Sequence, residues 1–252
     1  MAEREPLDVI DAIFSTPAMR YLKTDPIPDE IIWAILDAAI RAPSGTNTQR
    51  WGWMVVRDQE TKDGIAEIYR DTWARANRIV GHGAERTRDE EFTANKKVEF
   101  GAANYNSVEH LADHFEYAPV LIVPFMIQSG LRPGDDPDAE PVVRPFQGSP
   151  LMGGSIYQAV QNMQLAARAY GIGTTYTSVA NTEEHEPRMK ELLGLPVNTR
   201  TMCIIPLGYP LDVDELAEVG ASPARARFFR PNRIPVDQVT HWDKFGEQKD
   251  RD

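Results

Sequence analysis

Residues 118–127, APVLIVPFMI, form the longest apolar run of the chain and limit how it can fold. The run is too short to cross a bilayer, so it has to be buried inside a folded protein. Its β-branched residues favour a buried strand. Pro119 and Pro124 have no N–H group to donate, so we expect them to mark the start of the strand and a bulge or sheet edge.

Other segments show the spacing of helices and strands. Apolar residues at helical spacing predict a helix over residues 31–42, which begins at Pro28 and ends before Pro43. The same signals predict helices over residues 7–14, 61–80, 85–114, 153–170 and 184–193, and strands over residues 52–57, 174–179 and 201–208. This mixture indicates an α/β or α+β fold, which we take as one domain over residues 1–252.

Two segments lack a core of their own. Residues 129–150 contain five prolines and several acids, so we expect a long loop that acts as a lid or binding loop. Residues 210–252 are polar, arginine-rich and interrupted by prolines. We expect this tail to lie over another surface, such as a partner subunit.

Charge and composition exclude several classes of protein. The 252 residues carry a formal net charge of −11, which disfavours binding to the phosphate backbone of nucleic acids. Cys203 is the single cysteine, so no internal disulfide can form. The first fourteen residues have acids where a signal peptide needs basic and apolar regions. We therefore expect a cytoplasmic protein that does not act at a membrane.

The usual catalytic motifs are weak in this sequence. His110 and His114 have the four-residue spacing of a zinc-binding pair, but no glutamate follows the first histidine and a solvated helix face is the favoured interpretation. Cys203 lies in a predicted buried strand, where a thiol is usually inert. The glycine pairs fit neither a dinucleotide fingerprint nor a phosphate-binding loop. We expect no metal site.

Several polar segments are candidates for ligand binding. Residues 41–51, RAPSGTNTQRW, connect a predicted helix to a predicted strand and are either a plain turn or a site where backbone amides hold a ligand. The other candidates are residues 18–20 after the first helix, residues 174–178 on a late strand, and the tail arginines Arg225, Arg227, Arg230 and Arg233.

The order and spacing of these segments resemble those of the FMN-dependent nitroreductase family. The resemblance spans about residues 15–241 and is carried by RAPSGTNTQRW, QNMQLAARAYGIGTTYT, IIPLGYP and an arginine two residues before Pro235. It implies an α+β sandwich with a central, mostly antiparallel sheet flanked by helices. It also implies a homodimer with two FMN molecules in the interface and a C-terminal tail that wraps around the partner subunit.

The resemblance assigns the loop to the cofactor. Pro43, Ser44, Gly45 and Asn47 would approach the flavin, because small residues let the backbone come close to a flat ring. Gln49 and Trp51 would brace the loop. Most relatives have proline where Arg50 stands, so this chain departs from the family pattern there.

The resemblance also implies a phosphate site. The N-terminal segment that binds the phosphate and the pyrimidine side of the ring corresponds to residues 16–20, where Thr16 keeps a hydroxyl and only Arg20 keeps a charge. Ala18 occupies a position that would contact the cofactor, but its side chain has no hydrogen-bond donor. Arg233 matches a tail ligand of the phosphate and Arg230 would supplement it. Guanidinium groups suit phosphate oxygens.

The implied reaction is the transfer of a hydride from NADH or NADPH, followed by reduction of a nitroaromatic, a quinone or a similar electron-poor acceptor in a ping-pong scheme. Tyr176, Thr177 and Ser178 would lie against the flavin, with the Ser178 N–H bonded to its hydride-accepting nitrogen. Ser155 would contact the flavin from the start of a long helix. The loop 129–150 and residues 105–117 would shape the choice of acceptor, and no catalytic side chain is assigned.

Three alternatives remain open at this point. A flavin-dependent reductive dehalogenase or ene-reductase would use the same scaffold with other loops. A flavin-storage protein would bind the cofactor without turnover. A colourless binding module would have lost its phosphate ligands, as Pro17 and Ala18 suggest.

Overall fold

The computed structural model describes residues 7–81, 85–127 and 153–249. In this part of the chain a five-stranded sheet runs in the order β1-β4-β7-β5, with β6 also paired to β4, and all of its pairs are antiparallel. The strands are β1 (Trp51–Val56), β4 (Val120–Ile127), β5 (Gly173–Thr174), β6 (Thr199–Thr201) and β7 (Ile205–Gly208). A separate hairpin pairs β2 (Ile79–Val80) with β3 (Thr87–Arg88).

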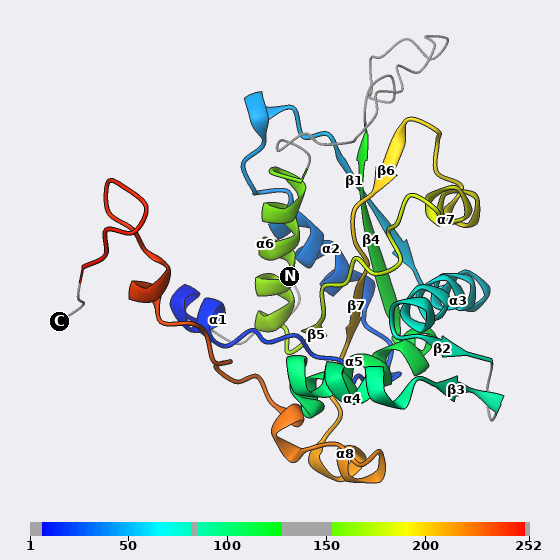
Figure 1. Cartoon of the computed structure of the whole chain (residues 1–252). Coiled ribbons are helices and arrows are strands. Elements are labelled where there is room, and N and C mark those ends of the chain that lie inside the picture. The colour runs from blue at the N-terminus through cyan, green and yellow to red at the C-terminus, as the bar shows by residue number, and fades with distance from the viewer. Residues whose placement is uncertain (1–6, 82–84, 128–152, 250–252) are drawn as a thin grey trace.

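Helices cover both faces of the sheet, as Figure 1 shows. They are α1 (Val9–Phe14), α2 (Asp29–Ala39), α3 (Gln59–Ala76), α4 (Glu90–Phe100), α5 (Ala102–Asp113), α6 (Ile156–Ala169), α7 (Glu186–Leu193) and α8 (Val213–Glu218). Short 3₁₀ turns are η1 (Gly45–Asn47), η3 (Phe115–Tyr117), η4 (Pro223–Ala226) and η5 (Val236–Val239). The expected α+β sandwich is therefore confirmed.

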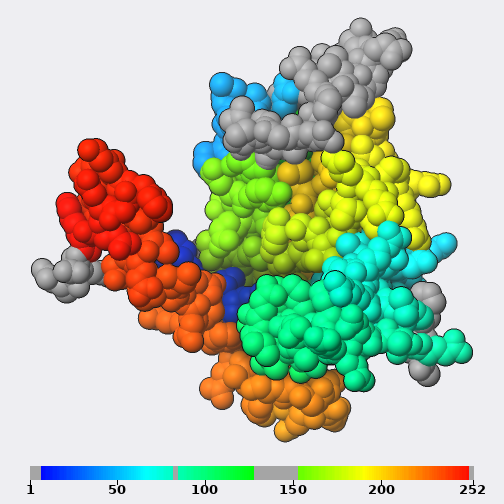
Figure 2. Space-filling model, viewed as in Figure 1, coloured from blue at the N-terminus to red at the C-terminus, as the bar shows by residue number. Residues whose placement is uncertain are grey.

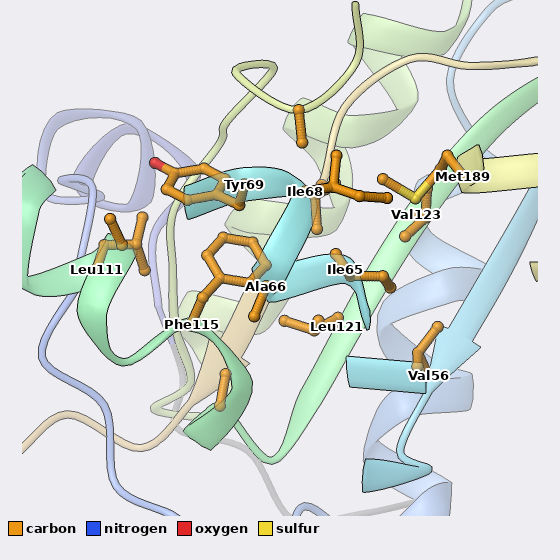
Figure 3. Packing of buried hydrophobic residues seen from close by; sticks show 14 of the residues in the cluster. Val56, Ile65, Ala66, Ile68, Tyr69, Leu111, Phe115, Leu121, Val123 and Met189 are labelled. Atoms are coloured by element: carbon orange, nitrogen blue, oxygen red, sulfur yellow. The ribbon is translucent and has the colours of Figure 1, made fainter. Parts of the chain in front are cut away.

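Strand β4 supplies both cores because its side chains alternate between the two faces. Val120 and Ile122 pack with α2 and α6 on one face. Leu121 and Val123 pack with α3, α5 and α7 on the other, where Figure 3 shows Val123 beside Met189. A strand that is buried on both faces needs a continuous apolar run, which residues 118–127 provide.

Pro124 was expected to mark a bulge or a sheet edge, and the structure has the bulge. Pro124 lies in a strand that is paired on both sides, and the bulge forms opposite it. Between the pairs Ile122–Ile205 and Phe125–Thr201, two residues of β4 face three residues, 202–204, of the neighbouring segment. Met202 donates to the Pro124 carbonyl over 2.9 Å, so the missing N–H points to the same side. The bulge forms where that donor is absent.

Other element boundaries differ from the sequence expectation. The single helix expected over residues 85–114 is instead β3 followed by α4 and α5. Gly101 separates the two helices with φ of 78°, a value that glycine adopts readily. The strand expected over residues 201–208 is divided by the bulge into β6 and β7. The strand expected over residues 174–179 ends at Thr174, apart from a bridge from Thr177 to Ile204.

The tail leaves the body of the molecule, as Figure 2 shows in orange and red. Beyond α8 it holds only the turns η4 and η5 within the described residues. Exposed apolar side chains on the tail include Ile234, Val239 and Phe245. The predicted lid over residues 129–150 lies outside the described residues.

We expect Phe115→Ala to lower the free energy of unfolding by about 3–5 kcal/mol. Phe115 is fully buried, and its ring stacks on Tyr69 with centroids 4.4 Å apart, so truncation leaves a cavity in the core. Chemical denaturation measures the change. Tyr117→Ala, two residues away and 54% exposed, is the control and should change stability by less than about 1 kcal/mol. Equal losses in the two variants would contradict this account of the core.

Candidate functional site

A cavity of about 950 Å³ opens between the N-terminal arm (residues 16–20), the end of α3, the helices α4 and α5, and the tail. Figure 2 shows the green α4–α5 segment beside the orange part of the tail. The volume lies at the upper end of the roughly 300–1,000 Å³ typical of ligand sites. Four cationic residues line it, and no Asp or Glu is among its described lining residues. These cationic residues are Arg20, Lys96, Arg225 and Arg233.

Three cavity arginines form no ion pair with any described residue. Arg20 donates to the Ser107 hydroxyl over 3.2 Å, and Arg225 donates to the Asn104 side-chain oxygen over 3.3 Å. Arg233 donates to the carbonyl of its neighbour Asn232 over 3.0 Å. Among the described residues none of the three pairs with a carboxylate, whereas many arginines elsewhere do. In an acidic chain, a set of arginines around one cavity is suited to binding an anionic ligand.

Arg20 and Arg225 lie close enough to influence each other. Burial lowers the pKa of Arg20 below its usual value, and the positive charge of Arg225 lowers it further. Two neighbouring guanidinium groups repel each other until an anion lies between them. Sequence analysis noted Arg225 as a tail arginine but gave it no role in the site.

The arm is fixed by backbone contacts. The Met19 N–H donates to the Thr174 carbonyl over 2.8 Å, which joins the arm to β5. Ala18 and Pro17 line the cavity. The Thr16 hydroxyl donates to the Ala12 carbonyl over 2.6 Å, so it is already engaged with α1.

The loop after α2 lies away from this cavity, near the start of α6 (Figure 1). The Gly45 N–H donates to the Ser155 hydroxyl over 3.3 Å, and the Ser44 hydroxyl accepts from Gln49 over 3.1 Å. Asn47 accepts from the Gln49 side chain over 3.1 Å and adopts φ of 54°. Pro43 is exposed. None of the predicted loop contacts lines the cavity of the same chain.

The segment after β5 divides between the core and the surface. Thr177 is buried and exchanges two backbone hydrogen bonds with Ile204, of 3.1 and 2.8 Å. Tyr176 is 40% exposed, and its ring lies edge-on to Tyr157 in the first turn of α6, with centroids 6.0 Å apart. Ser178 is exposed. Tyr176 therefore lies beside the first turn of α6, whereas the Thr177 side chain hydrogen-bonds to Tyr69, which interacts electrostatically with Arg20.

The two tail arginines of the prediction have different environments. Arg233 lines the cavity with Arg20, as expected for two groups that share one anion. Arg230 lies outside the cavity lining and pairs with Asp11 over 2.8 Å. Its guanidinium is also 5.4 Å from the centre of the Phe14 ring. The geometry favours Arg233 as a ligand of an anion in the cavity and does not favour Arg230 in that role.

Comparison with known proteins agrees with this fold. The model of the nitroreductase family matches residues 15–209. The chain belongs to the nitroreductase family. Membership makes it an oxidoreductase of the nitroreductase type.

Individual relatives of this nitroreductase-family chain are distant. It is 25% identical to the NADH dehydrogenase of Thermus thermophilus, over 94% of this chain and 96% of the relative. It is 26% identical to iodotyrosine deiodinase 1 of Rattus norvegicus, over 77% of this chain and 59% of the relative. Its fold matches the NADPH:FMN oxidoreductase of Vibrio harveyi, solved in complex with NAD+, with a TM-score of 0.62. That match has 19% identity and covers 95% of this chain and 79% of the other.

Sequence reasoning missed most of the helical wall of the cavity. Trp73 on α3, Lys96 and Phe100 on α4, and Tyr105 on α5 line it. Of these four residues, Tyr105 alone lies in residues 105–117, the segment that was expected to shape acceptor choice; Val108 in the same segment also lines the cavity. The sequence did place Trp73 on a mostly polar helix, which could have marked it as a ligand contact. The wall as a whole could not be predicted, because the sequence was interpreted as one helix where the structure has α4 and α5.

The two histidines of α5 belong to a stack of rings. His110 lies between Tyr21 and His114, with ring centroids 4.2 and 4.1 Å away. Burial, together with His114, lowers the pKa of His110 to about 4, although Asp113 opposes the shift. In the described part of this family member, no three His, Cys, Asp or Glu side chains are grouped to hold a metal. None of its described helices has the length and hydropathy needed to cross a membrane.

We expect stability to fall as the pH drops from about 6.5 towards 4. His110 has a folded-state pKa of about 4 and an ordinary value of 6.5, so the unfolded chain binds more protons in that window. With allowance for its half-buried position, the loss is about 2 kcal/mol. Denaturant titrations at each pH measure it.

His110→Phe keeps a ring against Tyr21 and should flatten this pH dependence. His241→Phe, in the tail, is the matched control and should leave it in place. An unchanged slope in His110→Phe would show that another group titrates.

Proposed function

We propose that this chain is an FMN-dependent NAD(P)H oxidoreductase that reduces nitroaromatics, quinones or related electron-poor acceptors. Its cofactors are FMN and a nicotinamide dinucleotide as electron donor. The observation that carries the proposal is the cavity that Arg20, Arg225 and Arg233 line without carboxylate partners among the described residues. Family membership and the names of the Thermus and Vibrio relatives support it.

The cavity residues fit a phosphorylated cofactor. A phosphate carries a charge of about −2 and needs several donors, which guanidinium groups supply in pairs. Arg20 on the arm and Arg233 on the tail would hold the phosphate, and the exposed Ala18 leaves the backbone of the arm open to the cofactor. When bound, FMN supplies the capacity to accept a hydride and to pass on two electrons.

A homodimer would complete the site. The loop residues Pro43, Ser44, Gly45 and Asn47 lie away from the arginines of their own chain, so a second copy would have to bring its loop to this cavity. Exposed apolar side chains support such an interface, because contiguous apolar surface commonly marks a contact between chains. They are Val9, Ile10, Ile13 and Phe14 on α1 and Ile234, Val236, Val239, Trp242 and Phe245 on the tail.

The residues of the chain orient ligands and exclude water. The Ser178 backbone N–H would donate to the ring of the cofactor, and Tyr176 and Ser155 would line the same side. The electron donor and the acceptor would occupy one position in turn, so parallel lines in double-reciprocal plots are expected.

The dehalogenase alternative has several relatives behind it and one observation against it. Iodotyrosine deiodinases of Rattus norvegicus, Danio rerio, Nematostella vectensis, Mus musculus and Drosophila melanogaster are 24–26% identical to this chain. The Rattus relative is named for iodotyrosine, an amino acid that carries an ammonium group. The described cavity lining contains no carboxylate to pair with an ammonium. We therefore favour an acceptor without a positive charge. We also propose that the chain forms a single domain and acts in the cytoplasm.

We expect Arg20→Ala and Arg233→Ala each to weaken FMN binding by roughly 10- to 100-fold, because each removes charged hydrogen bonds worth about 1.5–3 kcal/mol. Fluorescence titration of the apoprotein with FMN measures the dissociation constant. Riboflavin lacks the phosphate, so its binding should change much less. Arg227→Ala, an exposed arginine outside the cavity lining, is the control. Equal losses of affinity for FMN and for riboflavin would show that the phosphate binds away from these arginines.

Spectroscopy tests the function as a whole. The purified protein should be yellow, and anaerobic NADH or NADPH should bleach it. Addition of a nitroaromatic or a quinone should restore the colour. A yellow protein that neither nucleotide bleaches would favour storage, and a protein that stays colourless after incubation with FMN would overturn the proposal.

A further inference from the structure

We propose that Ser107 is a positioning residue for the FMN phosphate, because its hydroxyl holds the Arg20 guanidinium at the place where that group would meet the phosphate. The inference rests on the proposed function and adds a residue that does not touch the cofactor. Ser107 lies on α5, is 1% exposed and is not among the residues that line the large cavity. It can therefore act on a ligand there only through a neighbouring side chain.

The hydrogen bonds of the Ser107 hydroxyl give it a definite role. A hydroxyl has one hydrogen to donate and two lone pairs that accept. Ser107 donates its hydrogen to the Asn104 backbone carbonyl over 3.0 Å, one turn earlier in α5. The oxygen then accepts an N–H of Arg20 over 3.2 Å. Ser107 thus holds the guanidinium as an acceptor and has no proton left for an anion.

Arg20 depends on this contact because few other groups fix it. Among the described residues, Ser107 is the one hydrogen-bond partner of the Arg20 side chain. Tyr69 interacts with Arg20 electrostatically, but its hydroxyl bonds to Thr177. Arg225 carries a like charge and repels Arg20. Removal of the acceptor on Ser107 would let this repulsion move the Arg20 side chain away from its position.

The same face of α5 also holds the tail arginine. Arg225 donates to the Asn104 side-chain oxygen over 3.3 Å. Asn104 and Ser107 are three residues apart, so they are neighbours on one face of the helix. Helix α5 consequently separates two like charges at a set distance before a ligand arrives. Donors that are preorganised in this way bind an anion more tightly, because less order has to be imposed on binding.

The experiment compares FMN with riboflavin, which lacks the phosphate. The apoprotein of each variant is titrated with each flavin, and flavin fluorescence gives the dissociation constants. We expect Ser107→Ala to weaken FMN binding roughly 3- to 10-fold, the effect of one lost hydrogen bond, and to change riboflavin binding by less than about twofold. Alanine is the best helix former, so α5 should stay folded.

A double-mutant cycle shows whether Ser107 acts through Arg20. In an Arg20→Ala background, Ser107→Ala should weaken FMN binding by no more than about a further 1.5-fold, because the group that it positions is absent. Thr72→Val is the matched control. It removes a helical hydroxyl that donates to the Ile68 carbonyl over 3.0 Å outside the cavity lining, and it should change the binding of neither flavin.

An equal loss for both flavins would show that Ser107 only supports the fold and would overturn the inference. A Ser107→Ala effect that is undiminished without Arg20, or no effect at all, would overturn it too. The proposed function is tested separately. If Arg20→Ala weakens FMN binding and NAD(P)H bleaches the flavin while Ser107→Ala binds FMN normally, the function stands and the inference fails. If the protein binds no flavin, both fail.

Discussion

Strand β4 pairs with β1, β6 and β7, and the absent N–H of Pro124 at its centre shapes the site as well as the sheet. The neighbouring segment bulges opposite Pro124, and Ile204 in that bulge pairs with Thr177 instead of with β4. This bridge and the pairing of β5 with β7 hold the segment from β5 to Thr177 against the sheet, and Thr174 in β5 accepts the hydrogen bond of Met19. The position of Arg20, next to Met19, therefore depends on backbone contacts to the sheet.

Electrostatics then decides what the site can hold. An acidic chain has an excess of carboxylates available to pair with its arginines, and pairs such as Arg57–Asp29 show that it uses them. Arginines that stay unpaired around a cavity cost stability through mutual repulsion, which binding of an anion relieves. Cofactor binding and folding are consequently linked in this chain.

The sequence predicted the layers of the fold because hydrophobic spacing determines which face of each element is buried. Residues 118–127 and 31–42 showed clear patterns, and both became the expected elements. The grouping of the arm with Arg233 was also predicted, from the resemblance of both segments to the family, and both line the cavity. Trp73 and Lys96 could not, because the cavity wall depends on how Gly101 turns α5 against α4. Likewise, sequence spacing could not reveal that Asp11 pairs with Arg230 and draws it away.

The central claim is that guanidinium groups from both ends of the chain hold one phosphate while a second copy supplies the loop that faces the flavin ring. A crystal structure of the protein grown with FMN tests it directly. The account predicts a dimer, with phosphate oxygens within hydrogen-bonding distance of Arg20 and Arg233 and residues 43–47 of the other copy at the ring. A monomer, or FMN bound away from these two arginines, would contradict it.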